Sequence, residues 1–493
     1  MVFSSTIFLC FFMPVMIIGF YILPKKLKNI YLLLGSLFFY AWGEPKYVFI
    51  MLASIVGNYC FGMLVHVLTG KEKLRRMAIL FTVLYNLGIL FYFKYFVFAV
   101  ESVNEITGAG LTVPEIVLPI GISFYTFQGM SYVIDVYRED GIVNEQGERT
   151  VFVQKNPLNL ALYISMFPQL IAGPIVRYKD IKESLTNRVL SAASFARGVE
   201  RFIIGLAKKA ILANSIGEVA DTIFAGDYTM MGTGTAWLGA VCYTLQIYYD
   251  FSGYSDMAIG LGKIFGFDFM ENFNYPYISR SITEFWRRWH ISLSTWFRDY
   301  LYIPLGGNRK GLMRTYLNLL IVFLATGFWH GAAWGFIIWG LWHGVFMIIE
   351  RVLRAKDVKH LIKNGKARSV CDWLYTMLVV MLGWVLFKIV IMEDALSYIG
   401  VMLHTHTPDY VAFSTRYYLD NKLIFMLVIA ILAAIPWKDI LPGKAGILLN
   451  NINSLPAAHP AVIIRRVSLL CMLLICMMFI MNNTYNPFIY FRF

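Results

Sequence analysis

Charged residues are scarce in this sequence, and so are polar interruptions of its apolar runs. Asp, Glu, Lys and Arg make up 15% of the 493 residues, whereas hydrophobic residues make up 58%. A soluble globular domain carries about 25% charged residues. The composition therefore excludes an ordinary soluble protein and predicts an all-α, polytopic protein of the cell membrane.

Apolar runs of about 20 residues, the length that crosses a bilayer as a helix, recur from end to end. The longest polar stretches, 138–156, 351–370 and 392–421, are too short to bury a core of their own. We therefore predict a single membrane domain over residues 1–493. The predicted spans are 5–22, 28–42, 47–67, 77–98, 117–134, 157–173, 197–215, 236–263, 313–328, 332–352, 371–391, 422–436 and 462–481.

Cysteine is also scarce, and its spacing excludes the usual metal sites. None of the six cysteines forms a Cys-x-x-Cys pair. Neither a metal cofactor nor a disulfide framework is expected.

The formal net charge of +13 fits either nucleic acid binding or membrane topology. The basic residues cluster in short loops, at 25–28, 71–76 and 351–368, as cytoplasmic loops do. We therefore expect contact with anionic lipid and no nucleic acid partner. The first two basic clusters place the N-terminus on the extracytoplasmic side, and Arg465 and Arg466, at the start of the last predicted span, place the C-terminus on that side as well.

Two apolar runs contain helix breakers. Pro119 interrupts the run at 117–134, and Gly173-Pro174, which follows Pro168, interrupts the apolar run that begins at 157. Non-helical backbone at membrane depth is tolerated only where protein or a water-filled cavity surrounds it. The breaks predict re-entrant segments around a polar interior, with ordinary proline kinks in spanning helices as the alternative.

A third run, at 236–263, carries unusually many polar side chains. Gln246, Asp250 and Asp256 lie there among several tyrosines. Carboxylates inside a span are costly in lipid and are expected to face the interior of the bundle. Asp250 and Asp256 either line a substrate-binding cavity or belong to a hydrogen-bond network between helices, and the sequence is compatible with both.

Residues 282–297 are predicted to form an amphipathic helix in the plane of the membrane interface. At about 100° per residue, Arg287 and Arg288 fall on the polar half, and His290 falls on the border between the two faces. That border suits either the mouth of a cavity or the headgroup level of the interface. The apolar side consists of Ile282, Phe285, Trp286, Trp289, Leu293, Trp296 and Phe297.

A turn-rich basic stretch follows at 298–310. Its glycine amides, together with Asn308 and Arg309, are candidates for binding the phosphates of a cytoplasmic donor. The stretch has no Walker spacing, so it does not by itself indicate a nucleotide site.

His330 lies inside one of the most apolar stretches, directly after Trp329. An ionisable side chain at that depth is costly unless it lines a wet or reactive cavity. We predict a functional role for His330, with a packing histidine between helices as the alternative.

These motifs resemble one family when they are taken in order. Phe285-Trp-Arg-Arg-Trp-His290, the turn at 302–309 and Gly327-Phe-Trp-His330-Gly-Ala-Ala-Trp334 are similar to motifs of the membrane-bound O-acyltransferase (MBOAT) family, in particular its branch of alginate O-acetyltransferase membrane subunits. The segments at 119–125, 167–174 and 249–256 resemble the same branch, so the resemblance extends over nearly the whole chain.

The resemblance implies a ring of tilted and re-entrant helices around a central tunnel. Acetyl-CoA or another acyl thioester would enter from the cytoplasm, and an acceptor hydroxyl from the other face. His330 would be the catalytic residue, acting as the base that takes the hydroxyl proton, and His290 would orient the reactants or contact the donor. The substrate-binding residues would be Arg287, Arg288, Asn308, Arg309, Asp250, Asp256 and Trp329.

The final segment, Asn486-Pro-Phe-Ile-Tyr490-Phe-Arg-Phe493, has two interpretations. Its aromatic residues suit an interfacial belt. It also resembles the Phe-x-Tyr-Phe-x-Phe tail of extracytoplasmic acyl-relay systems, including a small partner peptide of teichoic acid D-alanylation. That resemblance implies Tyr490 as a third catalytic residue, which passes the acyl group to a serine nucleophile of a secreted or membrane-anchored partner and so to a polysaccharide.

Two other functions stay open at this point. One is transfer of D-alanine from a carrier-protein thioester to teichoic acid. The other is a transporter or flippase that uses the broken helices as a site at the midplane. The sequence shows no inverted repeat, which disfavours the transporter.

Overall fold

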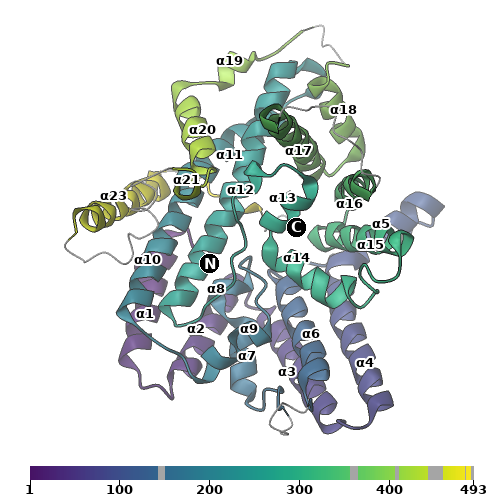
Figure 1. The fold of residues 1–493 in the computed structure, drawn as a ribbon, viewed down its shortest axis with the longest axis vertical. Helices are drawn as coiled ribbons and strands as arrows, with labels where there is room; N and C mark the ends of the chain where they lie inside the picture. The colour runs from purple at the N-terminus through teal and green to yellow at the C-terminus, as the bar shows by residue number, and fades with distance from the viewer. Residues whose placement is uncertain (143–149, 356–364, 406–409, 442–458, 483–484, 490–493) are drawn as a thin grey trace. The chain divides into compact units, whose positions relative to one another are not determined.

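The computed structural model describes residues 1–142, 150–355, 365–405, 410–441, 459–482 and 485–489. All regular secondary structure in these residues is helical (Figure 1). The predicted all-α fold is therefore confirmed, whereas the ring and the tunnel stay expectations. Tyr490, predicted as a catalytic residue, lies outside the described residues.

The helices follow one another along the chain, with short turns of π or 3-10 type marked η. Up to residue 264 they are η1 (Phe8–Phe12), α1 (Met13–Ile22), α2 (Lys28–Gly43), α3 (Val48–Val67), α4 (Glu72–Leu90), η2 (Phe91–Tyr95), α5 (Phe96–Thr107), α6 (Ile122–Glu139), α7 (Pro157–Ser165), α8 (Phe167–Leu170), α9 (Tyr178–Thr186), α10 (Ala192–Ala207), η3 (Lys208–Ala213), α11 (Asn214–Phe224), η4 (Tyr228–Met230) and α12 (Thr233–Ile264). After it come η5 (Pro276–Ile278), α13 (Ile282–Arg288), α14 (Ile291–Phe297), η6 (Arg298–Tyr302), α15 (Leu312–His330), α16 (Trp334–Ala355), α17 (Gly365–Lys388), α18 (Met392–Met402), α19 (Thr415–Tyr418), α20 (Asn421–Ala433), α21 (Trp437–Ile440) and α23 (Pro460–Asn482).

The chain forms two compact units. The first comprises Met1–Phe202 and Met257–Met270, and the second comprises Ile203–Asp256 and Glu271–Phe493. The prediction of one domain over 1–493 stays a prediction. The histidines and carboxylates singled out in the sequence all belong to the second unit.

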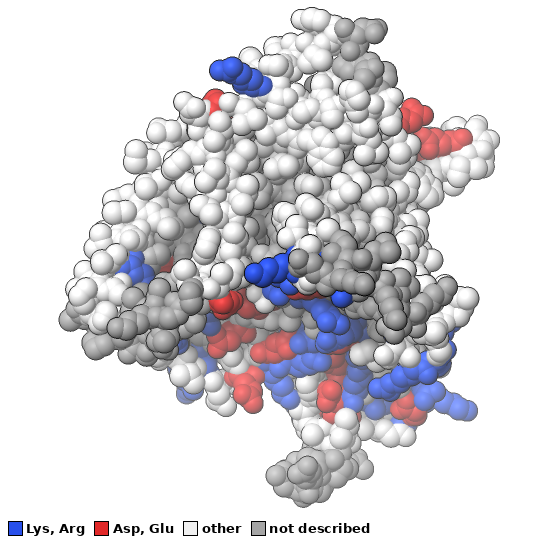
Figure 2. Space-filling model, turned by 45° about the horizontal axis from the view of Figure 1, so that its top comes forward, with Lys and Arg blue, Asp and Glu red and all other residues white. Residues whose placement is uncertain are grey.

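Six of the described helices are long and apolar enough to cross a membrane. They are Val48–Val67, Glu72–Thr107, Leu312–His330, Trp334–Leu353, Gly365–Lys388 and Pro460–Asn482, and the shorter apolar helices are Phe8–Ile22 and Asn421–Ala433. The predicted list of spans is longer than this because runs such as α2, with 16 residues, are too short, and α12 is too polar. Figure 2 shows wide areas of one face without a charged side chain, as expected of a surface in lipid.

The two predicted breaks are present in the first unit. The chain has no helix between Thr107 and Ile122, and α7 and α8 are separated at Met166 by backbone that is not helical. Neither 117–134 nor 157–173 is a single continuous helix, as the predicted breaks require. Because Pro168 and Gln169 are buried, the second break lies in the protein interior, whereas most of the non-helical stretch 108–118 before Pro119 is exposed.

In the second unit, α15 and α16 form a closely packed helical hairpin. A Cβ at Gly327 would overlap the carbonyl oxygen of Phe336, and a Cβ at Gly340 would overlap that of Phe323. Two glycines therefore let the backbones approach each other as small residues do in membrane helix pairs. This hairpin fixes the position of His330, the last residue of α15.

The predicted interfacial helix at 282–297 is wrong in two respects. The segment is two short helices, α13 and α14, separated at His290, and its predicted lipid-facing side is buried inside the protein. Trp286 and Trp289 pack against rings of α16 and α17, with ring centres 5.8 Å from Trp339 and 4.8 Å from Trp384. The apolar face packs against other helices. An amphipathic pattern shows which face of a helix is apolar, but not whether protein or lipid covers that face.

Candidate active site

His330 is buried among aromatic rings at the end of α15. Its ring centre lies 4.9 Å from that of Trp329, 5.0 Å from Trp339 and 5.2 Å from Phe387. Only 5% of the residue is exposed. The apolar stretch therefore places an ionisable ring in an aromatic enclosure that leaves little room for water.

His290 lies between α13 and α14 in a left-handed backbone conformation, with φ of 45°. Such a conformation costs about 1–3 kcal/mol in a residue other than glycine, and it tends to occur at functional sites. The side chain is fully buried, so the predicted position on the border with water is wrong. The break in the helix turns His290 inward instead.

Asn272 determines which nitrogen of His290 carries a proton. Asn272 Nδ2 donates to Ser255 Oγ at 3.0 Å, and Oδ1 accepts from the Ser292 N–H at 3.2 Å. The same Oδ1 lies 3.1 Å from His290 Nδ1, which must therefore be the donor. Nε2 is then the nitrogen with the lone pair, and it is suited to accept a hydrogen bond from a hydroxyl group.

The two histidines and Trp329 lie together. The ring centres of His290 and His330 are 6.5 Å apart, and Trp329 packs against both. Three of the predicted site residues, from two separate motifs, therefore meet in one enclosure.

Burial lowers the pKa of His290 to about 3. In the unfolded chain, the His290 side chain binds a proton below its ordinary pKa of about 6.5, whereas in the folded chain it does so only near pH 3. The free energy of unfolding therefore decreases as the pH falls from about 6.5 to about 3. We expect the wild type to lose up to about 1.4 kcal/mol per pH unit from this residue. Thermal unfolding in detergent at pH 7 and pH 5 should show a smaller acid shift in His290→Gln than in the wild type. The exposed His404→Gln should match the wild type, and equal acid shifts in all three proteins would contradict the expectation.

Asp250 on α12 contacts both a neighbouring helix and the C-terminal segment. Its carboxylate lies 2.6 Å from Lys209 Nζ, and it accepts a hydrogen bond from the Ile489 N–H at 2.9 Å. Lys209 also donates to the carbonyl oxygen of Pro487. We call these two side chains with the two backbone groups the clamp, because a buried ion pair holds the main chain at two points.

The clamp gives a prediction for Lys209→Met, which leaves the Asp250 carboxylate buried without its ammonium partner. Breaking a buried pair in this way costs about 3–5 kcal/mol. We expect a lower melting temperature and faster proteolysis of the C-terminal segment. Lys209→Met combined with Asp250→Leu should recover stability but not protection of the segment.

Lys208→Met is the matched control, since Lys208 pairs with Asp256 at 2.7 Å but is 24% exposed, so its loss should cost less. If Lys208→Met and Lys209→Met lowered stability and protection equally, the clamp would have no special role.

Lys208 and Lys209 were not among the site residues predicted from the sequence. Asp256, like Asp250, has an ion-pair partner from η3, so both carboxylates take part in contacts between helices. The signal was available, because Lys208 and Lys209 are a charged pair inside the apolar run at 197–215, and intramembrane charges pair with one another.

Four predicted substrate-binding residues are Arg287, Arg288, Asn308 and Arg309, of which Asn308 and Arg309 are the candidates for the donor phosphates. Arg287, Asn308 and Arg309 are exposed, and Arg288 forms an ion pair with Glu284 at 2.9 Å. Their binding of a donor stays a prediction. No group of His, Cys, Asp or Glu able to hold a metal ion occurs in the part of the chain that the structure describes.

Comparisons with known proteins agree with this architecture. Residues 37–356 match the membrane-bound O-acyltransferase family. The probable alginate O-acetylase AlgI of Pseudomonas putida is 40% identical over 505 residues, covering 100% of both chains. The peptidoglycan O-acetyltransferase of Helicobacter pylori is 34% identical over 519 residues, covering 100% of this chain and 98% of its own. The teichoic acid D-alanyltransferase of Bacillus subtilis is 33% identical over 246 residues, which is 46% of this chain and 58% of its own. The chain therefore belongs to the MBOAT family and is a membrane-bound O-acyltransferase.

Proposed function

We propose that this enzyme takes an acetyl group from a cytoplasmic thioester, such as acetyl-CoA, for O-acetylation of a polysaccharide outside the membrane. The proposal is supported by the names of the two relatives that align with the whole chain, an alginate O-acetylase and a peptidoglycan O-acetyltransferase. The D-alanyltransferase aligns with less than half of it. D-Alanine therefore stays the alternative acyl group.

In this proposal His330 is the general base. The acceptor oxygen attacks the thioester carbonyl carbon while His330 takes the hydroxyl proton, and the C–S bond then breaks. The imidazolium returns the proton to the leaving thiolate, so the products are an ester and a thiol. The aromatic rings around His330 keep water from the thioester and so limit its hydrolysis.

His290 serves as the positioning group. Because Asn272 holds the proton on Nδ1, Nε2 accepts a hydrogen bond from the acceptor hydroxyl or from the donor. Trp329 contacts both histidines and forms one wall of the enclosure in which the reactants are held. Asn308 and Arg309 remain candidates for the donor phosphates, and Arg287 and Arg288 for other contacts with substrate, since three of these four residues are exposed.

The first acceptor in the proposal is the Tyr490 phenol, and the observation that carries this step is the clamp. Ile489, its neighbour in the chain, is 7% exposed and is bonded to Asp250. The next residue on α12, Phe251, packs against His290 with ring centres 4.6 Å apart. A continuous chain of contacts therefore links the C-terminal segment to the histidines. The acyl-tyrosine would pass its acyl group to a serine of a secreted or membrane-anchored partner, and from there to the polysaccharide.

The test is acyl transfer by the purified protein in nanodiscs with acetyl-CoA alone. Mass spectrometry of the C-terminal peptide should find one acetyl ester on Tyr490, which mild alkali removes. A second reaction with a D-alanyl carrier-protein thioester distinguishes the alternative. Absence of an ester from the peptide in both reactions would exclude the relay.

The proposed topology has a separate test. Both termini should be accessible to labels only from the extracytoplasmic side.

A further inference from the structure

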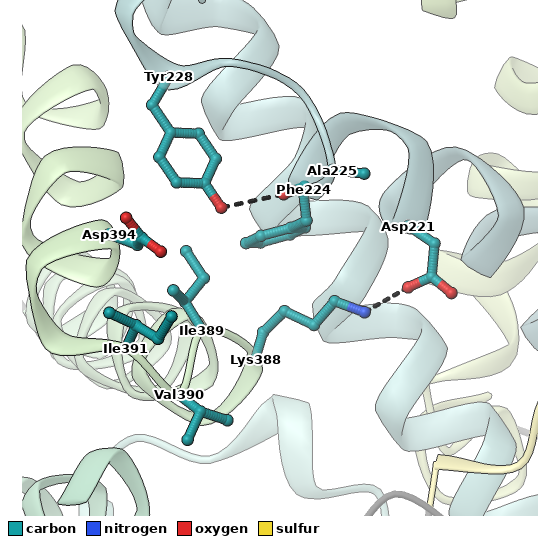
Figure 3. A pocket seen from close by; sticks show the side chains of 9 residues that line it. All are labelled: Asp221, Phe224, Ala225, Tyr228, Lys388, Ile389, Val390, Ile391 and Asp394. Atoms are coloured by element: carbon teal, nitrogen blue, oxygen red, sulfur yellow. Dashed lines mark hydrogen bonds and ion pairs between the residues drawn. The ribbon is translucent and has the colours of Figure 1, made fainter.

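A cavity of about 490 Å³ lies in the second unit where several helices end. Its lining includes Asp221 and Phe224 at the end of α11, Tyr228 in η4, Lys388 at the end of α17, and Asp394 in the first turn of α18 (Figure 3). One of the helices whose ends line the cavity, α17, is among the six candidate spans.

The polar atoms of this cavity are mostly hydrogen-bond acceptors. The Lys388 ammonium, the one cation of the lining, is paired with Asp221. Tyr228 donates its hydroxyl proton to the Phe224 carbonyl oxygen at 2.9 Å, so its oxygen has lone pairs left to offer. The Asp394 carboxylate only accepts, and it is exposed. A ligand that satisfies this lining must bring several hydrogen-bond donors.

The charge around the cavity disfavours an anionic ligand. The segments 221–228 and 388–394 contain four carboxylates, including the exposed Asp227 and Glu393, against the single amine of Lys388. Hydrogen bonds from Thr229 lower the pKa of Asp227, which keeps it ionised. Like charges brought together at a binding site reduce affinity. A polymer of uronic acids is therefore a poor fit.

The cavity also has an apolar side. Figure 3 shows the rings of Tyr228 and Phe224 between the Asp394 carboxylate and the Lys388–Asp221 pair, with Ile391 nearby. A lining of rings and aliphatic chains with a few placed polar groups is typical of small-molecule sites. A pyranose ring combines hydroxyl donors at its edge with apolar C–H groups on its faces.

We propose that this cavity binds a neutral sugar unit of the acceptor polysaccharide, which rests on the proposed function. Asp221 connects the cavity to the C-terminal segment, because its Oδ2 accepts a hydrogen bond from the Tyr485 hydroxyl at 2.6 Å. The cavity is therefore linked to the described part of the C-terminal segment through Tyr485. The acceptor class is a polymer with neutral hydroxyl-bearing units rather than a polyuronate.

The experiment measures binding of two tetrasaccharides to the full-length protein in nanodiscs by titration calorimetry, with no acyl donor present. The probes are a neutral β-1,4-linked glucose tetrasaccharide and a tetra-uronate of the same length. We expect the neutral probe to bind at least tenfold more tightly. Asp394→Asn should weaken its binding about fivefold, and Ile391→Trp, which fills the cavity from an exposed position, should abolish it.

Glu393→Gln is the matched control, since it removes a neighbouring carboxylate outside the lining and should leave binding of the neutral probe as in the wild type. Tighter binding of the uronate, or unchanged binding in both Asp394→Asn and Ile391→Trp, would overturn the proposal. Because no donor is present, the result is independent of whether Tyr490 accepts an acyl group, so the two proposals fail separately.

Discussion

His330→Ala is expected to lower acyl transfer roughly 10²–10⁴-fold, the usual contribution of a positioned general base. The physical reason is the enclosure of Trp329, Trp339 and Phe387, which leaves no solvent base to replace the imidazole. The measurement is the rate of thiol release and of Tyr490 ester formation with saturating acetyl-CoA.

The variant must be compared at equal protein level and melting temperature, because an alanine at this position also removes packing. His404→Ala, in an exposed turn, is the control and should retain full activity. A variant His330→Gln, which keeps much of the volume but cannot take a proton at neutral pH, should be as inactive as His330→Ala. Activity near the wild-type level in His330→Gln would reduce His330 to a packing residue.

Tyr490→Phe is expected to reduce the acetyl content of envelope polysaccharide to background. The change keeps the aromatic ring, so any anchoring of the segment in the interface persists, but it removes the oxygen that receives the acyl group. The measurement is acetate released by mild alkali from purified polysaccharide of cells that express each protein at the same level.

Tyr410→Phe removes the hydroxyl of an exposed tyrosine elsewhere in the second unit and should have no effect. Asp250→Asn offers a separate check, because it weakens the clamp while leaving the Tyr490 phenol in place, and it should lower rather than abolish acetylation. Full polysaccharide acetylation by Tyr490→Phe would exclude the relay and would return the segment to a role as an aromatic anchor.

The sequence predicted what depends on composition and on chain breakers. The all-helical membrane fold, the non-helical segments near Pro119 and Pro168, and the burial of His330 in an apolar helix follow from properties of neighbouring residues. The enzyme class followed from motifs, and the transporter alternative has no support in the family assignment.

The rest depends on contacts between distant segments. The break at His290 is not visible in the 3.6-residue pattern, because the left-handed backbone there is maintained by Asn272, far along the chain. The pairing of Lys209 with Asp250 and Ile489 joins three parts of the sequence that no local rule connects. Sequence reasoning found the buried charges but not their partners.

The clamp has a consequence for how the acyl-accepting segment can be encoded. Lys209 and Asp250 contact a carbonyl oxygen and an N–H of the main chain, so they recognise the backbone more than the side chains. A separate short peptide of similar pattern would present the same two groups and could occupy the same place. Covalent attachment mainly raises the local concentration of the segment, to about millimolar for a short flexible connection. In the relay that we propose, the segment could therefore be part of the enzyme chain or a separate short peptide without any change in the chemistry.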